Sequence, residues 1–497
     1  MDLASSLAAG LNAAATPANL LCLFAGCLLG MLAGLLPGVR PATAVAMLTP
    51  LAYVLPPGGL LILLAAIAYG AAYGRAHAAL VNDPGGASRA DSFQLARQGR
   101  AGVAIGVASL AIFIGAAVGT LTLAVLAAPL AELSFQFGPT EYFSLMVLGL
   151  AGAAVLARGS LLKALAMTVL GLLLGVFAAA SRARPIFGLQ APADGALFVV
   201  LAVGLYGLGA IPHFLALPAR PREALPVANG RSLLPGGKDF RHVLPPLLRG
   251  TLLGCALGLL PGGGRLLGAY AAWALEKSTA LRAGEVPFGK GNSRGVAAPA
   301  AADGAGSQTM FVPLLALGVP TSAVAALLMG ALVIGHVPVG PQMMSGSPQL
   351  FWGLIASMWI GNVMLGAMSL PPLAPLWTRL HGAPYRLLLP VLVLLCSLGV
   401  YLVHRDAAEV ALAAGVAVCA CLFAQLACEP MPLLLGFVLG PAMEESLRGA
   451  MSLGGGDWGT FATRPISAGL LSAALLLVVF VAMPAVKLRR EDAFAPE

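Results

Sequence analysis

The feature that most constrains this chain is a run of 75 residues, 304–378, that contains no Asp, Glu, Lys or Arg. Four further charge-free runs cover residues 3–39, 41–74, 101–131 and 465–486. A helix needs about 20 apolar residues to cross a bilayer, so several of these runs can hold a crossing. Over the whole chain only 10% of residues are charged, whereas a soluble domain has about 25%. The pattern excludes a soluble, disordered or coiled-coil protein and predicts an all-α polytopic membrane protein.

The individual apolar stretches predict about 11–13 transmembrane helices. Some stretches are too short or too interrupted to cross alone, and we expect these to form re-entrant pieces. The chain contains 62 Gly and 37 Pro, a density that membrane helices tolerate because neighbouring helices satisfy the freed backbone groups. The approximate spans are 18–36, 41–55, 58–81, 101–128, 140–157, 160–180, 194–211, 243–260, 265–281, 307–335, 349–369, 384–403, 407–428, 430–442 and 465–486.

A basic interruption divides the chain into two parts. The segment 212–249 carries six Lys or Arg against two acidic residues, and by the positive-inside rule it is cytoplasmic, as is the basic C-terminus. We therefore expect an N-terminal transmembrane repeat over 1–211, a basic cytoplasmic linker over 212–242 and a C-terminal transmembrane repeat over 243–497. The net charge of +8 is attributed to loops that face the cytoplasm and anionic lipid, and not to nucleic-acid binding.

The two parts contain a repeated segment. Residues 26–38 read GCLLGMLAGLLPG and residues 250–262 read GTLLGCALGLLPG, with nine of thirteen positions identical. Each copy has glycine at every fourth residue, which puts a ridge along one helix face where another backbone can approach closely. The alternative is two unrelated packing faces of small residues. Internal duplication with Gly/Pro-interrupted helices is typical of secondary transporters, and we expect the two halves to superpose.

Helix breaks mark the candidate binding region. A second pair of interrupted segments covers 69–86 and 305–332. Broken helices expose N-terminal N–H groups that suit an anion and carbonyl groups that suit Na⁺. The competing interpretation is kinks that only ease packing. The four breaks, which we expect to converge near mid-membrane, are Pro37-Gly38, Pro84-Gly85, Pro261-Gly262 and Pro320-Thr321.

Ordered motifs along the chain resemble one known family. They are GLLPGVRPATAVAMLTPL (34–51), FGPTEYFSLMVLGL (137–150), GVAAPAAADGAGSQTMFVPLLALGVPTSAVAALLMGAL (295–332), IGNVMLG (360–366), LLLGFVLGPAMEESLRGAM (433–451) and GGDWGTFATRPIS (455–467). In this order they resemble the large permease subunit of the tripartite tricarboxylate transporters, the TctA family. The resemblance covers essentially the whole chain. It implies a multi-pass protein of the bacterial inner membrane, in two related halves, with substrate bound where broken hairpins meet.

The same resemblance implies function and partners. It implies a secondary active permease that moves a small organic anion, a carboxylate, and works with a small membrane subunit and a periplasmic solute-binding protein. The family's motifs differ here at polar positions: Arg294 replaces an acidic residue, Ala300 a glutamate, and Asp303 the first of an asparagine pair. Thr321 and Ser322 stand where the family has Pro-Gly-Ser. These changes leave open a degenerate member that does not transport.

Three arginines are candidate substrate ligands, because a guanidinium can hold a carboxylate bidentately. Arg40 and Arg265 follow the two Leu-Leu-Pro-Gly breaks; the alternative is that both extend to lipid headgroups. Arg75 lies in an apolar run, where a charge needs a partner, and Asp83 and Asp91 are near it in sequence. Arg75 could instead mark the cytoplasmic end of its span.

Polar residues near the breaks complete the candidate site. Asn82, Asp83 and Asp303 are candidates to ligate a coupling cation, Na⁺ or H⁺, although Asp83 also suits a turn before proline. Ser307, Thr321 and Ser322 are candidate substrate-binding hydroxyls. We expect no cofactor and no metal site, because the seven cysteines fall almost entirely in apolar spans without a CxxC pattern.

An enzyme is the alternative from another class, acting within the membrane on a lipid-linked substrate. The only catalytic pattern is GNSRG at 291–295, which as a hydrolase motif needs a strand before the serine. The sequence shows neither HExxH nor a phosphate-binding GxxxxGK[ST] loop. We therefore expect a transporter, driven by an ion gradient, and not an enzyme. Trp352, Trp359 and Trp377 are expected to be interface anchors.

Overall fold

The computed structural model describes residues 3–36, 38–81, 90–157, 160–183, 195–216, 237–260, 264–282, 286–370, 373–381 and 385–482. All regular secondary structure in these ranges is helical, with no strand among them. Seven described helices are long and apolar enough to cross a membrane, so the all-α polytopic prediction is confirmed. They are α2 (Pro17–Leu35), α4 (Pro57–Val81), α6 (Ala101–Ser134), α7 (Pro139–Leu156), α8 (Leu161–Ala183), α17 (Pro348–Met368) and α20 (Ala407–Gln425).

The remaining helices are shorter, broken or more polar. They include four shorter apolar stretches, one of which runs through α9, η2 and η3, so the total of 11–13 crossings stays a prediction. These helices are α1 (Leu3–Ala14), α3 (Pro41–Leu48), η1 (Thr49–Tyr53), α5 (Ala90–Arg97), α9 (Ala196–Ala202), η2 (Val203–Gly207), η3 (Leu208–Ala210), α10 (Ile211–Ala216), α11 (Gly237–Gly258), α12 (Gly264–Arg282), α13 (Ser293–Thr309), α14 (Phe311–Leu317), α15 (Ala323–Ile334), α16 (Pro341–Gly346), α18 (Ala374–His381), α19 (Tyr385–His404), α21 (Pro430–Leu453), α22 (Thr460–Thr463) and α23 (Pro465–Ala482).

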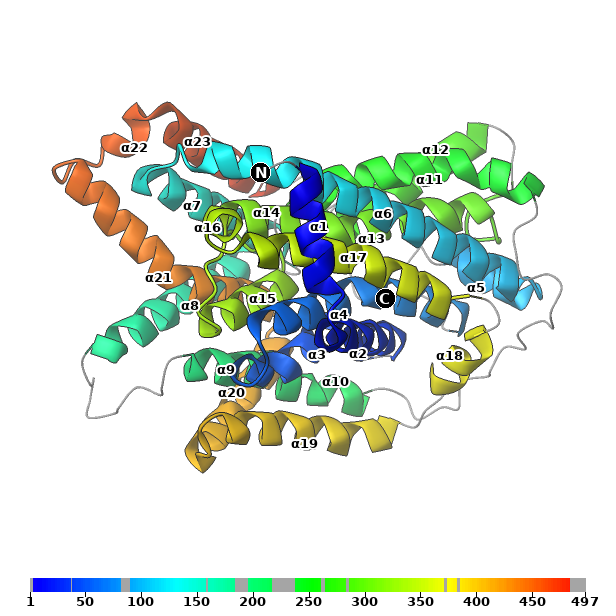
Figure 1. Ribbon diagram of the computed structural model, residues 1–497, viewed down its shortest axis with the longest axis horizontal. Helices are drawn as coiled ribbons and strands as arrows, with labels where there is room; N and C mark the ends of the chain where they lie inside the picture. Colours follow the sequence, from blue (N-terminus) through cyan, green and yellow to red (C-terminus); the bar gives the residue numbers. More distant parts are fainter. Residues whose placement is uncertain are drawn as a thin grey trace.

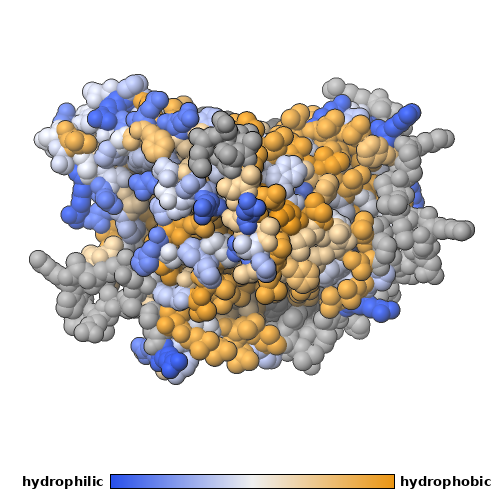
Figure 2. Space-filling view, viewed as in Figure 1, coloured by the Kyte–Doolittle hydropathy of each residue, from blue (hydrophilic) through white to orange (hydrophobic). Residues whose placement is uncertain are grey.

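Burial separates central helices from peripheral ones. In the most apolar part of each helix, 89% of the residues of α4 are buried, but only 22% of those of α20. Helix α4 therefore lies at the centre of the bundle. Figure 1 shows α6, α11 and α12 side by side at one end of the molecule and α21 to α23 at the other. Large hydrophobic areas lie on the surface in Figure 2. Exposed side chains such as Leu121 and Val125 of α6 are what a lipid-facing surface requires.

The glycine ridge of the first repeat packs against α4. A Cβ atom added to Gly34 would lie 2.2 Å from the carbonyl oxygen of Ala71, and one added to Gly30 would lie 2.7 Å from that of Ile67. Real side chains do not approach a backbone this closely, so only glycine permits the contact. The α2–α4 pair is accordingly one of the most extensive helix contacts in the molecule.

The ridge of the second repeat makes the matching contact with α13. A Cβ atom added to Gly250 would lie 2.2 Å from the Ala298 oxygen, and one added to Gly254 would lie 2.4 Å from the Ala302 oxygen. Each copy of the repeat therefore packs against a helix that comes later in the chain, α4 for the first copy and α13 for the second. The division at residues 211 and 243, and the cytoplasmic side of the linker, stay predictions, since residues 217–236 and 483–497 lie outside the described ranges.

Helix α13 also packs against the first half. A Cβ atom on Gly115 of α6 would lie 2.2 Å from the Ala301 oxygen, and one on Gly304 would lie 2.5 Å from the Ile112 oxygen. Glycines on both helices thus bring their backbones together. This contact places the polar residues of α13 between the two halves.

The helix ends agree with the predicted breaks. Helix α2 ends at Leu35 and α11 at Gly258, while α14 and α15 are separated by residues 318–322. Gly318 ends α14 with φ of 72°, and Gly38 has φ of 89°, a left-handed conformation that favours glycine. Pro37, Pro84, Gly85, Pro261 and Gly262 lie outside the described residues, so the convergence of the four breaks stays a prediction.

Candidate functional site

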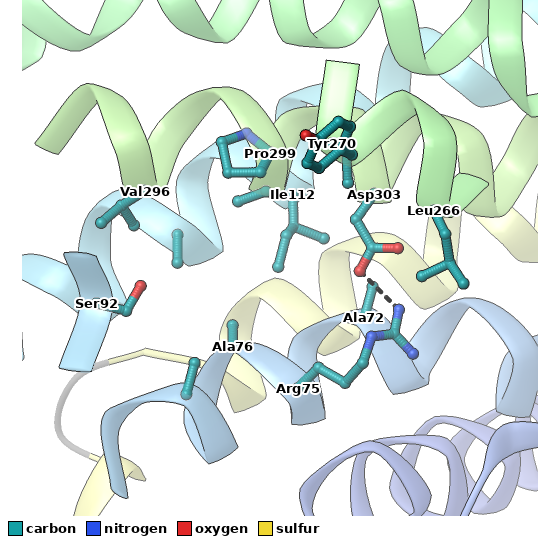
Figure 3. A pocket seen from close by; sticks show the side chains of 14 residues that line it. Ala72, Arg75, Ala76, Ser92, Ile112, Leu266, Tyr270, Val296, Pro299 and Asp303 are labelled. Atoms are coloured by element: carbon teal, nitrogen blue, oxygen red, sulfur yellow. Dashed lines mark hydrogen bonds and ion pairs between the residues drawn. The ribbon is translucent and has the colours of Figure 1, made fainter. Parts of the chain in front are cut away.

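A charged cluster joins helices α4, α12 and α13. On α4, Arg75 places Nη2 2.6 Å from Oδ2 of Asp303 on α13. In the first turn of α12, Arg265 places Nε 3.2 Å from the other oxygen of Asp303, Oδ1. The three side chains are only 15–20% exposed. Figure 3 shows Arg75 and Asp303 pointing toward each other from facing helices.

Local packing explains how Arg265 reaches Asp303. A Cβ atom on Gly306 would lie 3.2 Å from Cγ of Arg265 and 3.3 Å from its Cα. Gly306 therefore leaves room for the arginine stem one turn beyond Asp303 on α13. Sequence reasoning missed Gly306, although the glycine spacing around Asp303 was a usable signal for close approach.

A cavity of about 110 Å³ borders this cluster. Helices α4, α5 and α6 of the first half and α12 and α13 of the second half line it. Its polar lining groups include Arg75, Asp303, Ser92 and Tyr270, and alanines form much of the remaining wall. Charges in such a low-dielectric place are tolerated only when they are paired, and the two ion pairs to Asp303 meet that requirement.

The partner of Arg75 differs from the sequence expectation. Of the two nearby acids, Asp83 lies outside the described residues. Asp91 is buried, and its Oδ1 accepts hydrogen bonds from the backbone N–H groups of Gly289, Gly291 and Asn292 at 2.8–2.9 Å. Burial raises the pKa of the Asp91 carboxyl, and the three backbone donors oppose part of that shift. Asp91 thus anchors the loop before α13, and Arg75 pairs with Asp303 instead.

Arg40 stands apart from the cluster. It is exposed and occupies the N-cap position of α3, directly before Pro41. Of the three predicted arginines, the structure brings Arg75 and Arg265 together on one carboxylate. Arg265 turns into the bundle, whereas Arg40 is exposed at the surface, and the substrate-binding role of either arginine stays a prediction.

The predicted hydroxyl groups hydrogen-bond within the chain. Thr321 donates to the Met310 oxygen at 3.2 Å, and Ser307 donates to the Gly304 oxygen at 2.7 Å. Ser322 accepts from the N–H of Ala325 at 3.1 Å and so caps α15. Thr321 and Ser322 therefore shape the break at Pro320. Asn82 and Asp83 lie outside the described residues.

A second carboxylate with two arginines ties the helices of the second half together. Glu276 of α12 has a side chain with 0% exposure. Its Oε1 lies 2.9 Å from Nη1 of Arg249 on α11, and its Oε2 lies 3.6 Å from Nε of Arg294 on α13. Arg294, which departs from the family pattern, thus has a partner inside this chain.

The opposite face of α4 carries a neutral polar network. Tyr73 donates to Oδ1 of Asn362 on α17 at 2.6 Å, and Asn362 donates to the Phe113 oxygen on α6 at 3.0 Å. One turn along, Nδ1 of the buried His77 lies 3.0 Å from the Tyr73 oxygen. The asparagine of the IGNVMLG motif therefore links three central helices.

The tryptophan prediction is wrong for two of the three residues. Trp352 and Trp377 are buried, with 8% and 3% exposure. The indole of Trp377 donates to the Met368 oxygen at 2.8 Å, and its ring meets His77 edge-on. Trp359 is 40% exposed, and its role as an interface anchor stays a prediction.

Interrupted apolar helices, a repeated glycine ridge and an ion-paired cavity between helices are features typical of membrane transporters. The chain belongs to the tripartite tricarboxylate transporter TctA family. Its residues 20–435 match the sequence pattern of that family. It is 42% identical over 505 residues to the "uncharacterized 52.8 kDa protein in TAR-I ttuC' 3'region" of Agrobacterium vitis, covering all of both chains. It is also 41% identical over 244 residues to the "uncharacterized protein in TAR-II ttuC' 3'region" of the same organism, covering 49% of this chain and all of that one. No solved structure matches it.

Proposed function

We propose that this chain is the permease subunit of a secondary transporter that carries a small organic anion, a carboxylate, across the bacterial inner membrane. In this proposal an ion gradient drives transport, and a periplasmic binding protein supplies the substrate. Family membership supports a component of a tripartite transporter with further subunits. A small membrane subunit and the binding protein are therefore the partners.

The observation that carries the proposal is the shared carboxylate of Asp303. Two guanidinium groups, from Arg75 and Arg265, meet at one carboxylate beside a cavity. The geometry that holds the Asp303 carboxylate can also hold the carboxylate of a ligand. Because the site is largely removed from water, such a contact is stronger there than at the protein surface.

The position of the cluster supports alternating access. Arg75 belongs to α4 of the first half, whereas Asp303 and Arg265 belong to α13 and α12 of the second. An anion that competes for Arg75 weakens an ion pair between the halves. A ligand shifts a conformational equilibrium only through such differential contacts. The halves then move against each other around the site.

Na⁺ or H⁺ is the proposed coupling ion. Both Asp303 oxygens face arginines in this conformation, which favours an ion-pairing role for Asp303 over cation ligation. Asn82 and Asp83 stay candidate cation ligands in the first-half break. The proposed site needs no cofactor.

The enzyme alternative has no supporting observation. Ser293 of the GNSRG pattern is the first residue of α13, directly after its N-cap residue Asn292. Residues 286–292 before it form no strand. The strand–turn–helix setting that this hydrolase motif requires is therefore missing from the described chain around Ser293.

Uptake into proteoliposomes tests the proposal. The chain, reconstituted with its partner subunits, should accumulate at least one radiolabelled carboxylate under an imposed Na⁺ or H⁺ gradient. Arg75→Lys and Arg265→Lys keep the positive charge but lose the planar guanidinium that can donate two hydrogen bonds to one carboxylate. Each should therefore raise the half-saturation concentration about tenfold. Arg448→Lys, at an exposed pair with Glu444, is the matched control. Normal uptake kinetics in both cluster variants would remove the arginines from the site.

A further inference from the structure

An apolar cavity lies on a different face of α6 from the one that borders the charged cluster. Helices α6, α11 and α17 line it, and its volume is about 580 Å³, within the usual range for ligand pockets. Its lining includes Val363, Leu370 and Phe240, whose side chains are 59%, 50% and 38% exposed. Exposed apolar side chains on membrane helices face hydrocarbon, so the cavity opens toward the bilayer.

The cavity is polar at one end of its lining and apolar at the other. Ser369, directly after α17, is fully buried, and its hydroxyl has no hydrogen-bond partner in the part of the chain that the structure describes. The Ser369 carbonyl oxygen accepts a hydrogen bond from Ser109 of α6 at 3.4 Å, so the two serines lie side by side. Phe113 and Val363 line the other end. A buried hydroxyl without a partner is costly, and Ser369 lines a space that a ligand can enter.

Two arginines lie beyond the polar end of the cavity. Arg100 is the exposed N-cap residue of α6, and it precedes the first cavity-lining residue of that helix by six positions, about 9 Å. Arg241, also exposed, follows the cavity-lining Phe240 on α11. The two helix starts lie at the same end of the molecule, because Val243 of α11 and Val103 of α6 belong to one buried cluster.

The charge at this end suits an anionic group. The segments RQGR (97–100) and GKDFRH (237–242) together carry four Lys or Arg against one Asp. Two long helices, α6 and α11, also begin here, and helix N-termini carry partial positive charge. The positive-inside rule predicts that such an end faces the cytoplasm, where the membrane leaflet contains anionic lipid.

We propose that this cavity binds an anionic phospholipid. Arg100 and Arg241 hold the phosphate, and the Ser369 hydroxyl donates a hydrogen bond to an ester carbonyl. One acyl chain then lies along Phe113 and Val363. This site is separate from the proposed anion site, and the inference does not depend on the proposed function.

The order of groups along the cavity favours a lipid over a helix of a partner protein. Basic groups, a hydroxyl and an apolar wall follow one another, as phosphate, ester and alkyl chain do in a phospholipid. A partner helix is about 10 Å wide, so it could cover the exposed side chains but could not reach the buried Ser369. A single flexible acyl chain can.

Photolabelling of the purified full chain tests the proposal. The protein in detergent micelles receives phosphatidylglycerol that carries a diazirine in one acyl chain, and mass spectrometry locates the labelled residues. Label should concentrate on 106–113 and 363–370 and be sparse at 121–125, an exposed part of α6 outside the cavity. Unlabelled phosphatidylglycerol should compete at about tenfold lower mole fraction than phosphatidylcholine, because basic residues favour the anionic headgroup.

Matched variants separate the headgroup from the acyl chain. The double variant Arg100→Gln/Arg241→Gln should remove most of the preference for phosphatidylglycerol, whereas Arg448→Gln, at an exposed arginine of α21, should keep it. Ala367→Trp places an indole in the cavity from an exposed lining position and should abolish most of the labelling. Ala411→Trp, at an exposed position of α20, should leave the labelling unchanged.

The wild-type protein alone can overturn the proposal, even where a variant fails to fold. Label spread evenly over the lipid-facing helices would show ordinary surrounding lipid and no site. Equal competition by the two lipids would remove the arginines from the headgroup contact. The labelling is repeated with the small membrane subunit bound: label that persists on 106–113 supports the lipid site, and label that disappears assigns the cavity to that subunit instead.

Discussion

The helix pairs α2–α4 and α11–α13 pack through the same kind of close backbone contact, but the polar side chains around the two contacts differ. In each pair, glycines spaced by four residues let two helix backbones meet. Around α4 the buried network is neutral and includes Tyr73 and Asn362. Around α13 it is ionic, with Glu276 held by Arg249 and Arg294. The duplicated part of the molecule is thus the packing scaffold, and the polar side chains differ between the halves.

The difference also shows where the site is assembled. Helices α12 and α13 supply Arg265 and Asp303, whereas α4 supplies Arg75 from the face opposite its neutral network. A single charge on α4 meets an opposite charge on α13. The two glycine ridges therefore pack alike, whereas the charged site formed by α4, α12 and α13 is asymmetric.

Removing the ionic network should have the largest effect on stability. Glu276→Gln removes the charge of a fully buried carboxylate that faces both Arg249 and Arg294, and breaking a buried pair costs about 3 kcal/mol or more. The midpoint of SDS unfolding in mixed micelles, followed by circular dichroism, measures the loss. Glu444→Gln removes one partner of an exposed i,i+4 pair and should change the midpoint little. Equal effects of the two variants would show that the Glu276 cluster is dispensable.

Replacing a glycine of either ridge by alanine should reduce stability by the same amount, and by less than Glu276→Gln does. Gly34→Ala and Gly250→Ala both place a Cβ atom 2.2 Å from a backbone oxygen, and such overpacking costs about 1–3 kcal/mol. The same unfolding assay compares them. Gly415→Ala on α20 is the control, because its Cβ would meet nothing within 4 Å. A large loss in only one ridge would mean that the two contacts are not equivalent.

Removing a hydrogen bond from the neutral network should reduce stability less than the changes at Glu276 and at the glycine ridges. Tyr73→Phe removes one hydrogen bond to Asn362, and hydrogen bonds between membrane helices contribute about 0.6 kcal/mol, at most about 1.7. We expect Tyr73→Phe to shift the unfolding midpoint less than Glu276→Gln does. A loss as large as that of Glu276→Gln would contradict the distinction between the neutral network of Tyr73 and the ionic cluster of Glu276.

Local pattern alone predicted much of the fold. The charge-free runs require membrane helices because bilayer crossing depends only on the length and polarity of a segment. The spacing of Gly26, Gly30 and Gly34 fixes one helix face, and that face is the one that packs. The ordered motifs indicated the TctA family, and the match over residues 20–435 confirms it.

The site depended on contacts that no local pattern contains. Arg75 and Asp303 are 228 residues apart, and Asp91 meets Gly291 from 200 residues away. Sequence proximity placed Asp91 near Arg75, but Asp91 accepts backbone hydrogen bonds instead. Arg40 and Arg265 both follow a Leu-Leu-Pro-Gly break, but only Arg265 turns inward beside Gly306. A sequence determines which helices form and which faces can pack, because those depend on neighbouring residues. Only the tertiary structure decides which charges meet, because that depends on how distant helices are rotated and placed against one another.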